Sequence, residues 1–180
     1  AHQRELDDRA ITLIAKRQPV AQDLRFVVGA IRMAADLERI GDLAKNIAKR
    51  VGAVGEGVAP RELSHSIEAM AQAVMVQVGA AVARYEARDA EALMRLRDDD
   101  EKIDVQYTAA FRELLTYMME DPRTIGVSTH LLFVAKNIER IGDHATNIAE
   151  TVSYLVTGEW VAAERPKGDT TSTTAVKAEG

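Results

Sequence analysis

A twelve-residue stretch that occurs twice constrains the fold of this chain more than any other feature. Residues 37–48 read LERIGDLAKNIA and residues 138–149 read IERIGDHATNIA, so nine of the twelve positions are identical at a constant offset of 101 residues. Apolar residues at helical spacing run through both copies. The duplication indicates two copies of one helical unit in a single chain.

Each copy carries two carboxylates four residues apart: Glu38 and Asp42, then Glu139 and Asp143. On a helix with about 3.6 residues per turn, such side chains lie one above the other on one face. Like charges in this arrangement destabilise an isolated helix by about 0.2–0.5 kcal/mol. Each copy also keeps a glycine, Gly41 or Gly142, where alanine would save about 1 kcal/mol. Two unfavourable choices repeated together indicate a role beyond helix formation.

Composition narrows the class of protein. An apolar fraction of 47% with only 4% aromatic residues is typical of alanine-rich packed helices. The net charge of -5, without a basic stripe, argues against nucleic acid as a partner. The absence of cysteine excludes disulfides and thiolate metal sites. The longest apolar run, residues 73–83, is interrupted by Gln77 and is shorter than the roughly 20 residues of a membrane span.

Apolar spacing predicts helices at 5–17, 20–54, 62–85, 90–120 and from 122 to about 156, and no strand. We therefore expect an all-α fold of tandem antiparallel three-helix bundles, the first lacking its N-terminal helix. Residues 1–56 would form a partial first repeat of two helices, residues 57–158 a second repeat of three, and residues 159–180 a disordered tail. The chain opens without methionine inside a helical pattern, which suggests a trimmed protein or a fragment.

An antiparallel hairpin about Pro122 would place a second pair of acids, Asp100 and Asp104, at the level of Glu139 and Asp143. Four carboxylates on two adjacent helices could bridge hard cations, whereas burying them without a cation would be strongly repulsive. The alternative is a set of structural acids paired with Arg39, Arg140 or Lys45. His144 points about 100° away from Asp143 on a helix, so we interpret it as a surface side chain.

If the helices on either side of Pro19 form a similar antiparallel hairpin, the residues facing Glu38 and Asp42 would be residue 1 and positions before it. We therefore expect a complete site at Glu139 and a half-built site at Glu38. A bundle that lacks one helix would also expose an apolar groove, which a second copy of the chain would fill.

The doubled ERIGD motif with its downstream Asn-Ile-Ala resembles the PhoU family. Further matches are Lys16-Arg17-Gln18-Pro19, Asp23-Leu24-Arg25 and LLTYMMEDPRTI at 114–125, so the resemblance covers roughly residues 5–157. It implies a pair of three-helix bundles whose E(D)xxxD motifs can hold multinuclear clusters, of iron or zinc in some members and absent in others. The oxygen ligands themselves add manganese and magnesium as candidates. Carried over by position, one motif pair comprises Asp100, Asp104, Glu139 and Asp143, and Glu38 and Asp42 make half of the other.

The resemblance also implies a function. A PhoU-like chain would be a cytoplasmic, often dimeric, negative regulator of phosphate uptake and of the phosphate-starvation response. It would link the ATPase of the phosphate ABC transporter to a sensor histidine kinase and would reach the membrane only through these partners. The rival is a metal-dependent all-α enzyme, a phosphohydrolase or di-metal oxidase, using the same acids. Neither ERIGD copy supplies the Glu-x-x-His of di-iron proteins, and no nucleophile or phosphate clamp lies near the acids, so we expect a protein that is not an enzyme.

Overall fold

The computed structural model describes residues 2–54, 61–89, 93–160, 169 and 171. These residues form five α-helices and one short 3-10 helix, and they contain no strand. The α-helices are α1 (His2–Arg17), α2 (Ala21–Val54), α3 (Arg61–Ala87), α4 (Leu93–Glu120) and α5 (Ile125–Thr157), and the 3-10 helix is Pro122–Thr124. The predicted all-α class is therefore confirmed.

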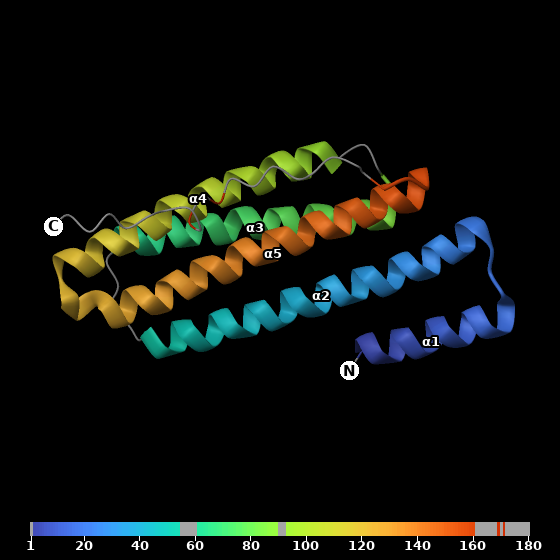
Figure 1. Ribbon diagram of the computed structural model, residues 1–180, viewed down its shortest axis with the longest axis horizontal. Helices are drawn as coiled ribbons and strands as arrows, with labels where there is room; N and C mark the ends of the chain where they lie inside the picture. Colours follow the sequence, from blue (N-terminus) through green and yellow to red (C-terminus); the bar gives the residue numbers. More distant parts are fainter. Residues whose placement is uncertain (1, 55–60, 90–92, 161–168, 170, 172–180) are drawn as a thin grey trace.

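The helices lie along a common long axis, and α5 is central (Figure 1). It packs against α2, α3 and α4, whereas α1 folds back on α2. The chain thus has two helices in its first half and a three-helix bundle in its second, which confirms the expected tandem arrangement. The predicted boundary at residues 56 and 57 falls outside the described residues, as does most of the predicted tail, so these limits stay predictions.

Local signals at both ends of α5 explain its limits. Before it, Asp121 Oδ1 accepts a hydrogen bond from the Arg123 backbone N–H at 3.0 Å, and Pro122 takes the first position of the turn. After it, Gly158 adopts a left-handed conformation with φ 79, and its N–H donates to the Tyr154 carbonyl at 2.9 Å. The hairpin expected about Pro122 therefore joins α4 to α5.

The core lies along α5. Met70, Ile103, Leu114 and Ile148, from α3, α4 and α5, are among the largest side chains with less than 2% exposure. Burying a side chain of this size contributes roughly 1.5–3 kcal/mol. Alanines such as Ala81 and Ala145 are also fully buried, and their small side chains allow neighbouring helices to approach closely. The alanine-rich composition is thus used at helix contacts.

One segment of α3, Ser64–Ala87, is long and apolar enough to cross a membrane by length and composition alone, although the apolar run within it is shorter. In the structure, α3 packs against α4 and α5 and contributes Ile67, Met70 and Val74 to the core. A core helix of a bundle passes the same test, so this feature is weak evidence for a membrane span.

Helices α2 and α5 are joined by a close backbone approach and by a polar pair. A Cβ added at Gly29 would lie 2.5 Å from Leu155 Cδ2, so a larger residue at this position would force the Leu155 side chain to move. His144 Nδ1 lies 2.8 Å from Asp36 Oδ1, and the two side chains are 20% and 17% exposed. The interpretation of His144 as a surface side chain is therefore corrected: because α2 covers that side of α5, His144 joins the two halves of the chain.

Candidate metal centre

Helices α4 and α5 bring the predicted acids of the second copy together. Asp100, Asp104 and Glu139 are 3%, 4% and 3% exposed, and Asp143 is half-buried. Burial raises the pKa of Glu139 above its usual value, and the negative charges of Asp143 and Asp104 add to that rise. Charges affect one another in this way only at short range, so Glu139, Asp143 and Asp104 lie near one another.

Lys136 offsets part of this negative charge. Its Nζ donates to Glu139 Oε1 at 3.0 Å and to Asp169 Oδ2 at 2.8 Å, and it lies 4.6 Å from the centre of the Tyr107 ring. Partial burial acts to lower the pKa of Lys136, but the bonds to Asp169 and Glu139 outweigh it and raise that pKa. Glu139 is therefore paired with Lys136 and not with Arg39, Arg140 or Lys45, the partners that the sequence suggested.

Gln77 of α3 is a further polar residue of this site. It is 2% exposed, and its Nε2 lies 3.3 Å from Asp100 Oδ1, 3.1 Å from Thr146 Oγ1 and 3.4 Å from the Leu96 carbonyl, all as donor. The sequence showed Gln77 only as an interruption of an apolar run. A single amide inside such a run is the signal that could have identified it, because a buried amide needs polar partners.

The glycine of each motif copy has a different environment. A Cβ at Gly142 would lie 3.0 Å from Gln77 Oε1 and 3.3 Å from Asp100 Oδ1. A Cβ at Gly41 would meet no atom of another described residue within 4 Å. Gly142 therefore allows α3 and α4 to reach α5 at the level of the acids, whereas Gly41 lies in open space.

The first copy of the motif is exposed over most of its length. Glu38 and Asp42 are both exposed, and the amide of Gln3 on α1 faces the Glu38 carboxylate. Equivalent positions of the two copies, 101 residues apart, differ strongly in exposure. Leu37 is 39% exposed and Ile138 3%, and Val51 is 55% exposed and Val152 2%. The structure thus gathers the acids of the second copy and leaves those of the first on the surface.

The carboxylate and amide oxygens of this site are ligands of the type that hard cations prefer. Their side chains are, however, not grouped as a complete metal site. Among the described residues, no three His, Cys, Asp or Glu side chains have the spacing of a metal site. Two buried oxygens, Glu139 Oε2 and Gln77 Oε1, have no hydrogen-bond partner among the residues that the structure describes. Buried acceptors normally have a hydrogen-bond partner. These two oxygens are therefore chemically suitable ligands for a hard cation.

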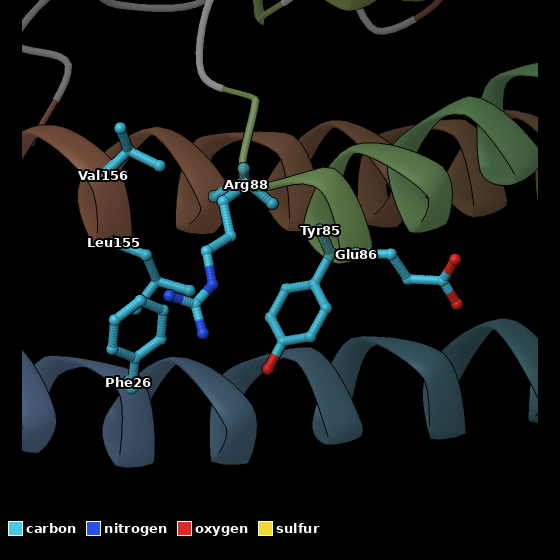
Figure 2. A pocket seen from close by; sticks show the side chains of 7 residues that line it. Phe26, Tyr85, Glu86, Arg88, Leu155 and Val156 are labelled. Atoms are coloured by element: carbon cyan, nitrogen blue, oxygen red, sulfur yellow. The ribbon is translucent and has the colours of Figure 1, made fainter.

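A cavity of about 200 Å³ lies between α2, α3 and α5, and none of the six predicted acids lines it. Figure 2 shows Arg88 reaching down between Phe26 and Tyr85, whereas Glu86 points away. The Arg88 guanidinium lies 4.3 Å from the centre of the Phe26 ring. This contact ties the end of α3 to α2, and it is separate from the carboxylate site.

We expect Lys136→Met to destabilise the fold in a pH-dependent way. The folded-state pKa of Glu139 is already above 4.5, so ionisation costs stability as pH rises, and loss of Lys136 would raise that pKa further. Since Lys136 is 38% exposed, the loss at neutral pH should be about 1–3 kcal/mol, below the value for a fully buried pair. The loss should shrink near pH 4, where Glu139 is protonated with or without Lys136. Urea unfolding across this pH range measures it, with Lys102→Met as an exposed control, and an equal loss at both pH values would contradict the pairing.

Comparison with known proteins agrees with this architecture. The family model described as PhoU domain matches residues 1–51 and 67–152. The chain is 57% identical to the phosphate-specific transport system accessory protein PhoU homolog of Rhizobium meliloti (strain 1021), over 95% of this chain and 72% of that protein. It is 49% identical to the homolog from Caulobacter vibrioides (strain NA1000 / CB15N), over 94% of this chain and 74% of that protein.

Solved structures give the same result. The crystal structure of PhoU from Pseudomonas aeruginosa aligns with a TM-score of 0.76 at 40% identity, covering 87% of this chain and 75% of that chain. The phosphate transport system regulatory protein PhoU from Streptococcus pneumoniae aligns with a TM-score of 0.76 at 29% identity, covering 89% and 75%. Sequence and fold together place this chain in the PhoU family.

Proposed function

We propose that this chain is a non-enzymatic regulator that lowers phosphate uptake and represses the phosphate-starvation response. It would do so in the cytoplasm by linking the phosphate ABC transporter to a sensor histidine kinase, with membrane contact only through these partners. Family membership carries the proposal, because the relatives are named as accessory proteins of the phosphate-specific transport system.

The burial of the acids supports a regulator over a metal-dependent phosphohydrolase or di-metal oxidase. A catalytic carboxylate has to come within hydrogen-bond reach of its substrate. Asp100, Asp104 and Glu139 are at most 4% exposed, and Lys136 already pairs with Glu139. In this arrangement the three acids are closed to a substrate.

Exposed apolar surface supports action by contact. An apolar groove of about 340 Å³ runs between α2 and α3, with Ile138 and Ile141 of α5 among its lining residues. On α3 beside it, Met75 is 57% exposed and Val76 73%. Contiguous apolar surface of this kind is typical of protein interaction sites.

The chain should retain the transporter ATPase or the cytoplasmic part of the sensor kinase when it is immobilised as bait. Met75→Glu should weaken retention by placing a charge at the groove, whereas Val105→Glu, at an equally exposed position of α4, should not. The measurement is a pull-down with purified components. Two results together would contradict the regulator and favour an enzyme. The chain would retain neither partner, and it would hydrolyse nucleotides in a way that Asp143→Asn abolishes.

The same proposal includes a cation at the second motif copy, held by Glu139, Asp143 and Asp104 with Asp100 adjacent. Iron, zinc, manganese and magnesium are the candidates. Glu139 Oε2, which has no hydrogen-bond partner among the residues that the structure describes, supports it, because a cation would satisfy that oxygen and offset the repulsion among the acids. Because the acids lack the spacing of a finished site, side-chain rotation would have to accompany binding.

Elemental analysis of protein purified without added metal tests the cation site. We expect bound metal in the unchanged chain and its loss in Glu139→Gln/Asp143→Asn. The equivalent change in the first copy, Glu38→Gln/Asp42→Asn, is the matched control and should leave the metal content unchanged, because those acids are exposed. Metal-free protein in all three cases would remove the cation from the proposal.

The exposed face of α2 supports self-association. Leu37 and Val51 are exposed, yet their equivalents on α5 are covered by other helices of the same chain. Between them, Gly41, Ala44 and Ala48 are small enough to let the α2 helices of two copies approach closely. A homodimer through this face would bury both Leu37 and Val51.

Sedimentation of the purified chain should show a dimer at micromolar concentration. The double substitution Leu37→Glu/Val51→Glu should shift it to monomer by introducing like charges across the contact, with Val105→Glu as the control for added charge. A monomer at every concentration would contradict the homodimer.

A further inference from the structure

Arg88 occupies a backbone position that usually belongs to glycine. It directly follows α3 and has φ 54, in the left-handed region. Its N–H donates to the Tyr85 carbonyl at 3.4 Å, and the Asp89 N–H donates to the Arg84 carbonyl at 3.1 Å, which are the two hydrogen bonds of a Schellman motif. A residue with a side chain is strained at this position, and such strain concentrates at functional sites. The position of Arg88 therefore indicates a role for its side chain.

The Arg88 guanidinium lies at the cavity between α2, α3 and α5. Figure 2 shows it between Phe26 and Tyr85, and it lies 4.3 Å from the centre of the Phe26 ring. Glu86, an acid among the residues that line the cavity, points away (Figure 2). Within the described parts of the chain, the contact with Phe26 is the one interaction of the guanidinium. Its N–H groups are therefore available to an acceptor in the cavity.

Most of the remaining cavity wall is apolar. The cavity has a volume of about 200 Å³, and its lining includes Phe26, Val152, Leu155 and Val156. Val152 and Leu155 are 2% and 3% exposed, and Leu155 lies against Gly29. An apolar cavity of about 150 Å³ can hold benzene, so this one has room for a six-membered ring or a branched chain of similar size. A bare, strongly hydrated anion would gain nothing from these walls.

The charges around the cavity favour an anion. Because the last turn of α5 lines it, the partial negative charge of a helix C-terminus lies close by. Arg25 of α2 offsets that charge, since a Cβ at Gly158, the residue that caps α5, would lie 3.2 Å from Arg25 Nη1. Beside Arg88, the Asp89 carboxylate is already paired with Arg84. The charge that a ligand in the cavity would meet is therefore that of Arg88.

We propose that this cavity binds a small organic oxyanion, with its apolar body between α2, α3 and α5 and its carboxylate or phosphate group on Arg88. A planar guanidinium pairs with both kinds of group through two parallel hydrogen bonds. Since α2 belongs to the first half of the chain and α3 and α5 to the second, the bound molecule would also stabilise the packing of the two halves. The site goes beyond the proposed function, to which it adds a small-molecule input.

Titration followed by ¹⁵N–¹H correlation spectra tests the ligand class. Phenyl phosphate and benzoate carry a ring with either oxyanion, whereas inorganic phosphate carries only the anion and phenol only the ring. We expect phenyl phosphate or benzoate to shift amides of residues 85–88 and 152–156 saturably, and to bind about tenfold more tightly than inorganic phosphate or phenol. Binding of neither oxyanion probe, or equally tight binding of inorganic phosphate or phenol, would overturn the proposal.

Matched variants test the role of Arg88. Arg88→Gln should weaken binding of the tighter probe about tenfold, because the charged donors are lost. Arg112→Gln, at an exposed position of α4 outside the cavity lining, should leave the affinity unchanged. Arg88→Gly should weaken binding to the same extent without lowering Tm, because glycine suits the left-handed position. Unchanged affinity in Arg88→Gln and Arg88→Gly would overturn the proposal.

A third variant tests the cavity itself. Val156 lines the cavity and is 43% exposed, so Val156→Phe can fill the space without burying a new polar group. We expect it to abolish saturable binding although Arg88 is unchanged, with Tm as the control for folding. Undiminished binding of phenyl phosphate or benzoate in Val156→Phe would show that the probes bind elsewhere and would overturn the site.

Discussion

Three carboxylates lie at most 4% exposed where α4 packs against α5, and this burial requires compensating polar groups from the neighbouring side chains. Burying like charges together is unfavourable unless positive charge or hydrogen-bond donors accompany them. Lys136 supplies an ammonium to Glu139, and Gln77 donates from α3 to Asp100. Because these groups come from α3, α4 and α5, the polar site also fixes how the three helices pack.

The first half of the chain shows what the same motif does without such neighbours. On α2, Glu38, Arg39, Gly41 and Asp42 of this motif are exposed and Ile40 is half-buried against the core. Among the described residues, α1 packs against α2, but no equivalent of the α3–α4 pair covers the exposed positions. Their acids need no buried counter-charge, and the glycine has open space around it. One sequence motif thus forms a buried polar site in one half and an exposed face in the other, and this difference separates the proposed cation site from the proposed dimer contact.

Much of the fold could be predicted from the sequence because its helices are long, strongly periodic and bounded by prolines and glycines. The predicted helix at 20–54 is observed as Ala21–Val54, and the one ending near 156 ends at Thr157. The juxtaposition of Asp100 and Asp104 with Glu139 followed from hairpin symmetry about Pro122. The partners of the acids could not be predicted in this way, because Gln77 comes from a helix outside the hairpin and Asp169 from 33 residues beyond Lys136. The contact of His144 with Asp36 also depends on how the two halves pack, which periodicity within one helix does not reveal.

The central claim is that packing by α3 and α4, and not the motif itself, gives the second copy its properties. The most direct measurement is the free energy of unfolding of the matched variants Gly142→Ala and Gly41→Ala. A methyl group at Gly142 would press on Gln77 and Asp100, both nearly fully buried, so the account predicts a loss of about 1–3 kcal/mol there. At Gly41 it predicts no loss, or a gain of up to about 1 kcal/mol from helix propensity. Equal effects at the two positions would contradict it.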